Sequence, residues 1–320
     1  MRSLIPVAGG WQLAAGSGLA AGRRMLRVAG GWRLAAGSGL RCVWLLLLTG
    51  LVCAMQGPVT AREPKRIVSL VPAATQMLFA IGAGPQVVAV SSYDEDPPEV
   101  RALPRVGALL DPDLERILSL RPDLVVVYGS QHDLRAQLSR AGIPFYAYAH
   151  ATEGALAHVS ATIRELGVRT GHEQEAERVA SAIERDLEAV RTRTAGRRRP
   201  RTLIVFGREP GTLRNLHASG GRGFIHELVE AAGGENVFGS VPRESVQASS
   251  EMLLRAAPEV ILELRGEGAA PVDLEAWRTL PAIPAVRAKR IVVLTGNEMV
   301  VPGPRIAAAA ARVAGALHGS

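Results

Sequence analysis

A helical segment followed by a proline, an acidic residue and an apolar run occurs twice in this chain, and this duplication constrains the fold more than any other feature. The first copy reads DLERILSLRPDLVVV over residues 113–127, and the second reads SSEMLLRAAPEVIL over residues 249–262. A capping residue with an acid in the first turn is typical of a helix start. An unbroken apolar run is typical of a buried parallel strand. We therefore expect two related α/β units.

Short β-branched runs alternate with helical segments from Lys65 onward, as in parallel α/β sheets. The predicted strands are 67–70, 87–90, 124–127, 145–148, 202–206, 260–264 and 291–294. The predicted helices include 75–81, 223–232 and 304–317.

A polar segment between the two halves, 172–194, carries apolar residues at helical spacing. A helix of this length spans roughly 35 Å, which suits a connection between two lobes. The expected fold is thus α/β, with two lobes of mainly parallel sheet joined by a single long interlobe helix. The expected boundaries are a leader at 1–61, an N-terminal lobe at 62–171, the helix at 172–195 and a C-terminal lobe at 196–320.

The net charge of +7 comes almost entirely from the leader. Residues 1–61 contain six of the 37 basic residues and no acidic residue, so the body has 31 basic and 30 acidic groups. This balance gives no electrostatic reason to expect nucleic-acid binding.

Residues 42–53, CVWLLLLTGLVC, form an uncharged run that is too short to span a membrane and fits the hydrophobic region of a signal peptide. Cleavage after Ala61 would follow, and the mature protein would be periplasmic. An uncleaved anchor and a lipid attached to Cys53 are the alternatives. A 13-residue repeat, 7–19 and 28–40, precedes this run. We interpret it as translated upstream DNA, with the true start near Met25, rather than as an interaction module.

Several enzyme and metal-site motifs are absent from the sequence. The body has no GxSxG, no GxxxxGK[ST] and no paired-histidine metal motif. The stretch Gly129–His132 follows a predicted strand but resembles a nucleophile elbow only superficially. His217 and His226 flank a loop, and either could bind haem iron or corrinoid cobalt axially.

The body resembles the periplasmic substrate-binding proteins of iron-siderophore, haem and cobalamin ABC importers. The stretches that carry the resemblance are RIVSLVPAATQMLFAIGAG (66–84), VVAVSSYDEDPPEV (87–100), 113–127, 172–194, AAGGENVFGSVP (231–242), 249–262 and PGPRI (302–306). The resemblance implies a monomeric, non-enzymatic receptor that has no cofactor or metal centre of its own and delivers its ligand to a membrane permease. It also implies that Glu115 and Glu251 dock onto permease arginines, although the helix dipole by itself explains an acid at each position.

Ligand-binding residues of such proteins lie in loops after the strands, facing the cleft. The resemblance therefore places ligand contacts at Pro72, Ala73, Thr75, Tyr93, Tyr128, Gly129, Arg208, Glu209, Asn297 and Glu298. The segments around Tyr93 and Pro97-Pro98 are most similar to those of cobalamin-binding members. However, Leu109, Ser245 and Glu298 stand near the positions where those members carry tryptophans, and Trp277 lies elsewhere.

The sequence therefore predicts a receptor for a corrinoid or a related metal chelate, so that any cobalt or iron belongs to the ligand. An anionic siderophore or haem, held through Arg208, Arg214 or Arg222, is the alternative ligand. A secreted α/β hydrolase is the alternative from another functional class.

Overall fold

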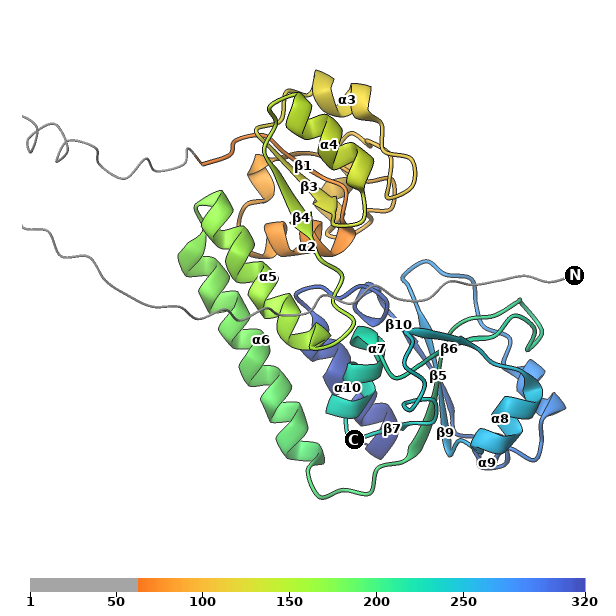
Figure 1. Cartoon of the computed structure of the whole chain (residues 1–320). Coiled ribbons are helices and arrows are strands. Elements are labelled where there is room, and N and C mark those ends of the chain that lie inside the picture. The colour runs from red at the N-terminus through yellow and green to blue at the C-terminus, as the bar shows by residue number, and fades with distance from the viewer. Residues whose placement is uncertain (1–62, 320) are drawn as a thin grey trace, which may run out of the picture. The chain divides into compact units, whose positions relative to one another are not determined.

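Two β-sheets organise residues 63–319, the part of the chain that the computed structural model describes (Figure 1). Sheet A has four parallel strands in the order β2-β1-β3-β4. Their bounds are Ile67–Ser69 for β1, Val87–Val90 for β2, Leu124–Tyr128 for β3 and Phe145–Tyr148 for β4. The apolar run of β3 is 5% exposed or less from Leu124 to Val127, as expected for a parallel strand covered on both faces.

Sheet B has the order β10-β9-β5-β6-β8. Its parallel strands are β5 (Arg201–Gly207), β9 (Val260–Arg265) and β10 (Ile291–Thr295), with β7 (Glu235–Asn236) paired to the start of β5. Its antiparallel strands are β6 (His217–Ser219) and β8 (Ser245–Gln247). All seven predicted strands are present, each within one residue of its predicted ends. The three additional strands have only two or three residues, too few to produce a recognisable alternation in the sequence.

The duplicated segment forms the same local structure in both halves. Helix α3 (Leu114–Ser119) begins at Asp113, whose carboxylate accepts the backbone N–H of Arg116 at 2.9 Å. Helix α8 (Ser250–Ala256) begins at Ser249, whose hydroxyl accepts the backbone N–H of Met252 at 3.2 Å. Each side chain satisfies a donor that the helix itself leaves unpaired, which confirms the capping residues read from the sequence.

Helix α6 (Glu173–Thr194) occupies the segment predicted as a long helix. A second helix that was not predicted, α5 (Ala155–Thr170), lies alongside it (Figure 1). Gly167 of α5 permits this approach, because a Cβ at that position would lie 2.3 Å from the Cβ of Ala176 in α6. The two helices therefore run together along one side of both sheets.

The start of α5 is fixed by a residue from the other half of the chain. Glu227 of helix α7 (Gly223–Ala231) accepts the backbone N–H groups of Ala155 and Leu156 at 2.9 and 3.0 Å. At its other end α5 contacts helix α2 (Pro72–Ala80), which follows β1. Thus α5 packs against helices of both sheets and connects them.

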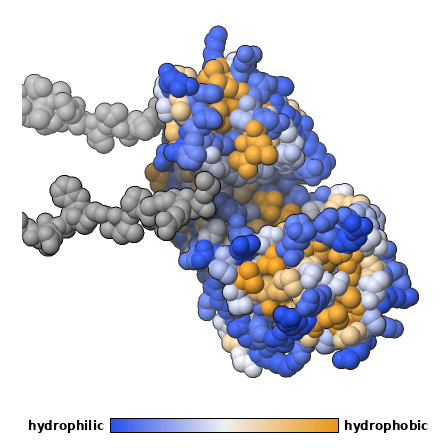
Figure 2. Space-filling model, turned by 45° about the vertical axis from the view of Figure 1, so that its right-hand side comes forward, coloured by the Kyte–Doolittle hydropathy of each residue, from blue (hydrophilic) through white to orange (hydrophobic). Residues whose placement is uncertain are grey.

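The remaining helices complete the layers around the two sheets. They are α4 (His132–Arg140), α9 (Pro284–Arg287) and α10 (Ile306–His318), with 3-10 turns at Gly84–Gln86, Pro98–Ala102, Leu274–Thr279 and Asn297–Met299. A large buried cluster combines residues of α2, α5, α6, α7 and α10 with one face of each sheet. The opposite faces of sheet A and sheet B have clusters of their own. Figure 2 shows the surface hollowed between the part built on sheet A and the part built on sheet B.

The proposed leader, Cys42, Cys53 and the cleavage point at Ala61 lie outside the described residues. No helix within residues 63–319 is long and apolar enough to span a membrane.

Candidate functional site

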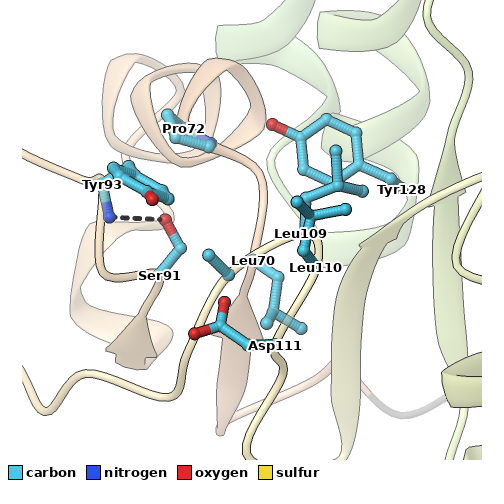
Figure 3. Close-up of a pocket in the computed structure, with 9 residues that line it drawn as sticks. Leu70, Pro72, Ser91, Tyr93, Leu109, Leu110, Asp111 and Tyr128 are labelled. Atoms are coloured by element: carbon cyan, nitrogen blue, oxygen red, sulfur yellow. Dashed lines mark hydrogen bonds between the residues drawn. The ribbon is translucent and has the colours of Figure 1, made fainter.

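A cavity of about 560 Å³ lies at the carboxyl edge of sheet A (Figure 3). The loops after three neighbouring parallel strands meet there: Leu70 and Pro72 follow β1, Ser91 and Tyr93 follow β2, and Tyr128 ends β3. The carboxyl edge of a parallel sheet is the usual place for a ligand in α/β folds. The last four lining residues, Ala108, Leu109, Leu110 and Asp111, come from the long loop before α3.

The lining of this cavity is mainly apolar and aromatic. Tyr93 and Leu110 are 75% and 92% exposed, so large hydrophobic surfaces there are open to solvent. Asp111 is the one acidic residue among the nine that line the cavity, and none of the nine is basic. Such a surface suits a bulky ligand with apolar faces and little negative charge.

Tyr93 is held by a hydrogen-bonded turn. The Asp94 carboxylate accepts the N–H and the hydroxyl of Ser91 at 2.9 and 2.6 Å, and the Ser91 hydroxyl accepts the N–H of Tyr93 at 3.2 Å (Figure 3). Arg105 closes the turn by donating to the carbonyls of Ser91 and Asp94 at 3.0 and 2.6 Å. The exposed ring of Tyr93 therefore projects from a backbone with little freedom.

Asp94 is buried beneath the turn. Burial raises the pKa of its carboxyl group, while hydrogen bonds from Ser91 and Thr75 and the charge of Arg105 act in the opposite direction. Burial also raises the pKa of Tyr128, and the charge of Asp94 raises it further. Tyr128 is therefore a neutral hydrogen-bonding group at physiological pH.

The Leu109–Leu110 loop is attached to β3 through Gln131. The Gln131 side chain accepts the N–H of Tyr128 at 2.9 Å and donates to the carbonyls of Ala108 and Leu109 at 3.3 and 3.0 Å. From the sequence, Leu109 is expected only to stand near a position where cobalamin-binding members carry tryptophan, and neither Leu110 nor Gln131 is among the predicted ligand contacts. The one sequence signal for Leu109 and Leu110 is that they form a pair of leucines in a loop, and Gln131 has no such signal.

Three of the six ligand-contact residues predicted from the first half, Pro72, Tyr93 and Tyr128, line the cavity. The other three do not. Ala73 is buried in α2, and the Thr75 hydroxyl donates to the Ser69 hydroxyl at 2.8 Å. Gly129 donates its N–H to the carbonyl of Tyr148 at 2.8 Å. Ala73, Thr75 and Gly129 thus support the cavity wall from behind.

Arg208 is an internal residue rather than an open cationic group. Its side chain is 1% exposed and pairs with fully buried Glu263 at 3.0 Å. The guanidinium also donates to the carbonyls of Thr212 and Asp273 at 2.8 and 2.6 Å, and Glu263 further accepts from the indole of Trp277 at 2.7 Å. The expected ligand contact at Arg208 is therefore corrected, because its donors are already used within the protein.

The other predicted residues of the second half also have protein partners. Glu209 accepts from the Asn215 side chain at 2.6 Å, and Asn297 accepts the N–H of Glu267 at 3.1 Å. Glu298 is 14% exposed and pairs with Arg312 and, at 3.8 Å, with Arg305. These residues do not line the sheet A cavity.

The arginines suggested for an anionic ligand are paired as well. Arg214 lies 3.7 Å from Glu209, and Arg222 lies 3.2 Å from Glu153.

Neither histidine suggested as an axial ligand lines the cavity. His217 lies in β6, and His226 contacts the amide of Asn236 at 3.2 Å. Within residues 63–319 no group of three or more His, Cys, Asp or Glu side chains is placed to hold a metal ion.

The two glutamates expected to dock both lie on exposed helix surfaces. Glu115 is in the first turn of α3 and Glu251 in the first turn of α8. Neither glutamate lines the cavity, and their helices pack against different sheets, α3 against sheet A and α8 against sheet B.

Comparison with known proteins places this chain among binding proteins. A family model described as periplasmic binding protein matches residues 67–298. A vitamin B12-binding protein of Pectobacterium carotovorum subsp. carotovorum is 31% identical over 260 residues, covering 78% of this chain and 87% of the relative.

Two solved structures share the fold. The periplasmic vitamin B12-binding protein of Vibrio cholerae has a TM-score of 0.68 and 26% identity, covering 80% of this chain and 97% of that one. The periplasmic haem-binding protein of Roseiflexus sp. RS-1 in apo form has a TM-score of 0.67 and 28% identity, covering 79% and 98%. The predicted two-lobed α/β fold is thereby confirmed.

Proposed function

Since the chain belongs to the periplasmic binding protein family, we propose that it is the substrate-binding component of an ABC importer and that its ligand is a corrinoid such as cobalamin. The protein binds and delivers its ligand without catalysis. Its relatives are named for binding, and their names support a corrinoid or haem as the ligand.

The observation that carries the choice of ligand is the chemistry of the sheet A cavity. Its nine lining residues include no basic side chain, while Tyr93, Leu109 and Leu110 expose apolar surface. A corrinoid has a neutral periphery rich in amides, whereas haem has two carboxylates, which proteins usually bind with arginine. The corrinoid therefore fits this surface better, with Tyr93 and Tyr128 offering hydroxyl groups to its amides.

Haem is the second candidate. It is supported by the haem-binding protein of Roseiflexus, which is as similar in fold and identity as the B12-binding protein of Vibrio cholerae. In either case the ligand would be covered from the sheet B side by the loops after β5 and β10, where Glu209, Asn297 and Glu298 lie.

Further features complete this proposal. Residues 1–61 serve as an export leader cleaved after Ala61, and the mature protein acts as a monomer in the periplasm. The lobes are 62–171 and 196–320, with 172–195 as the connecting helix. Glu115 and Glu251 bind basic residues of the membrane permease, because both carboxylates are exposed and lie on separate lobes.

Titration calorimetry with cyanocobalamin, haemin and a ferric siderophore tests the ligand. Cyanocobalamin is expected to bind with one site and haemin more weakly. Tight haemin binding with no cyanocobalamin binding would transfer the proposal to the second candidate. Ester hydrolysis without binding of any of the three would replace it with the hydrolase alternative. Mass spectrometry of the exported chain tests cleavage after Ala61 against lipid attachment at Cys53.

A further inference from the structure

A buried ionic cluster near the carboxyl edge of sheet B contains two arginines but one carboxylate. Glu263 of β9 is fully buried, and its carboxylate lies 3.0 Å from the guanidinium of Arg208 and 3.0 Å from that of Arg265. The indole of Trp277 donates to the same carboxylate at 2.7 Å. Arg208 alone balances the charge of Glu263, so the cluster has one positive charge in excess.

The two arginines differ in how many of their donors are used. Arg208 is 1% exposed and donates from all three nitrogens, to Glu263 and to two backbone carbonyls. Arg265 is 20% exposed, and within residues 63–319 it donates one hydrogen bond, from Nη2 to Glu263. Its Nε is buried and has no acceptor in that part of the chain. Since an arginine has five N–H groups, Arg265 has donors available for a further acceptor, and pairing them would offset the cost of a partly buried charge.

Arg265 lies at the edge of sheet B that meets the cavity loop of sheet A. It is the last residue of β9, which lies between β5 and β10 in the sheet. Its carbonyl accepts the N–H of Gly296 at 2.9 Å, in the loop after β10. That loop leads to Arg305, which pairs with Asp96 of the sheet A loop that carries Tyr93. We therefore expect the end of β9 to face a ligand held in the sheet A cavity.

The charge of the sheet A cavity indicates which part of a ligand Arg265 would contact. Among the nine residues that line this cavity none is basic, and Asp111 is acidic. An anionic group of the ligand would thus be held from the sheet B side, and one available arginine suits one such group. Cobalamin has a single phosphodiester, which links its corrin ring to the nucleotide base, whereas haem has two carboxylates. Arginine binds phosphate oxygens through paired, charge-assisted hydrogen bonds.

We propose that Arg265 binds the phosphodiester of cobalamin and so selects complete corrinoids over those without the nucleotide tail. This inference rests on the proposed function and adds a specificity-determining residue from β9. Glu263 holds one side of the Arg265 guanidinium, and the carboxylate is itself fixed by Arg208 and Trp277. The arginine is thereby positioned before the ligand arrives, which reduces the entropy lost on binding.

Calorimetry with three corrinoids tests this inference. Cyanocobalamin has the phosphodiester, dicyanocobinamide phosphate has a phosphate without the nucleotide base, and dicyanocobinamide has neither. Wild type is expected to bind the first two about tenfold more tightly than dicyanocobinamide, as one hydrogen-bonded charged contact provides. Arg265→Gln should lose this preference and bind dicyanocobinamide with unchanged affinity. Arg265→Lys, which keeps the charge but not the planar donor group, should retain part of the preference.

Two controls separate ligand recognition from stability. Arg255→Gln removes an arginine that is 82% exposed on helix α8 of the same half, and it should keep the wild-type preference. In Arg265→Gln the Glu263 carboxylate keeps Arg208 and Trp277 as partners. The affinity of that variant for dicyanocobinamide therefore reports whether the cavity is intact.

The outcomes distinguish this inference from the proposed function. Equal binding of all three corrinoids by wild type, or a preference that persists in Arg265→Gln, would overturn the inference and leave the proposed function in place. Equal weakening of all three by Arg265→Gln would overturn it as well, because that result shows a structural role. Binding of none of the three by wild type would reject the corrinoid ligand and the inference with it.

Discussion

Arg305 holds the carboxylate of Asp96 with both terminal nitrogens, at 2.9 Å from Nη2 to Oδ2 and 3.3 Å from Nη1 to Oδ1. Asp96 lies in the loop after β2, the same loop that carries Tyr93, and Arg305 lies between β10 and α10. Strands β2 and β10 are outer strands of their respective sheets. The ion pair therefore connects the cavity loop of sheet A with one edge of sheet B.

A second polar contact joins the opposite edges. His150 follows β4 and Glu244 precedes β8, and His150 Nε2 lies 2.7 Å from Glu244 Oε1. Strands β4 and β8 are the other outer strands of the two sheets. The two halves are thus linked on both sides of the cavity edge.

Removal of the Arg305–Asp96 pair is expected to accelerate ligand dissociation. The pair is partly exposed, so we expect its loss to cost about 1 kcal/mol, or roughly a fivefold faster off-rate. Stopped-flow dissociation of cyanocobalamin from Arg305→Gln, Asp96→Asn and the double variant measures this. The double variant should be no faster than either single variant. Additive effects would show that the two residues act separately, and Arg255→Ala serves as a control for loss of an exposed arginine.

Leu110→Ser is expected to weaken cyanocobalamin binding without changing stability. Leu110 is 92% exposed at the cavity, and covering such a side chain contributes about 1.5–3 kcal/mol, roughly tenfold or more in Kd. Calorimetry compares the cyanocobalamin affinity of this variant with that of Val168→Ser, a substitution away from the cavity. Unchanged affinity would place the ligand elsewhere.

Arg208→Ala is expected to lower stability rather than ligand affinity. The change leaves the Glu263 carboxylate buried with only part of its partners, which costs about 3–5 kcal/mol. Urea unfolding followed by circular dichroism measures the loss. Arg214→Ala is the matched control, since its side chain is 82% exposed and should change the free energy of unfolding by less than about 1 kcal/mol. A stable Arg208→Ala protein with weakened binding would restore Arg208 as a ligand contact.

Stability is expected to fall at alkaline pH through Tyr148. Burial, and then the neighbouring Tyr128, raise the pKa of Tyr148 to about 12 from its ordinary value of 10.0. The folded state thus holds the phenol proton more tightly than the unfolded state. The resulting stabilisation is fully present below pH 10 and is lost between pH 10 and 12, amounting to about 2–3 kcal/mol.

Urea unfolding at pH 9, 10 and 11 compares wild type with Tyr148→Phe. The variant has no phenol to ionise and should lose less stability over this range. Parallel losses in both proteins would assign the alkaline effect to other groups.

The part of the site that could be predicted from the sequence follows from strand ends. Pro72, Tyr93 and Tyr128 could be identified because each lies at or just after the carboxyl end of a strand that was itself predictable. The same rule selects the loops after β5 and β10 in sheet B, but it does not determine which way a side chain turns. Arg208 turns inward to Glu263 because β5 and β9 are adjacent and parallel.

The local pattern of the sequence determined the seven longer strands, the caps at Asp113 and Ser249 and the duplicated glutamates, because these depend on residues a few positions apart. Tertiary structure alone decided that the Leu109–Leu110 loop reaches Tyr128 through Gln131, that α5 lies beside α6, and that Asp96 meets Arg305 across 209 residues. Such contacts depend on where whole elements lie in space, and burial and pairing across the two sheets set those positions. The spacing of residues along the chain does not specify these contacts.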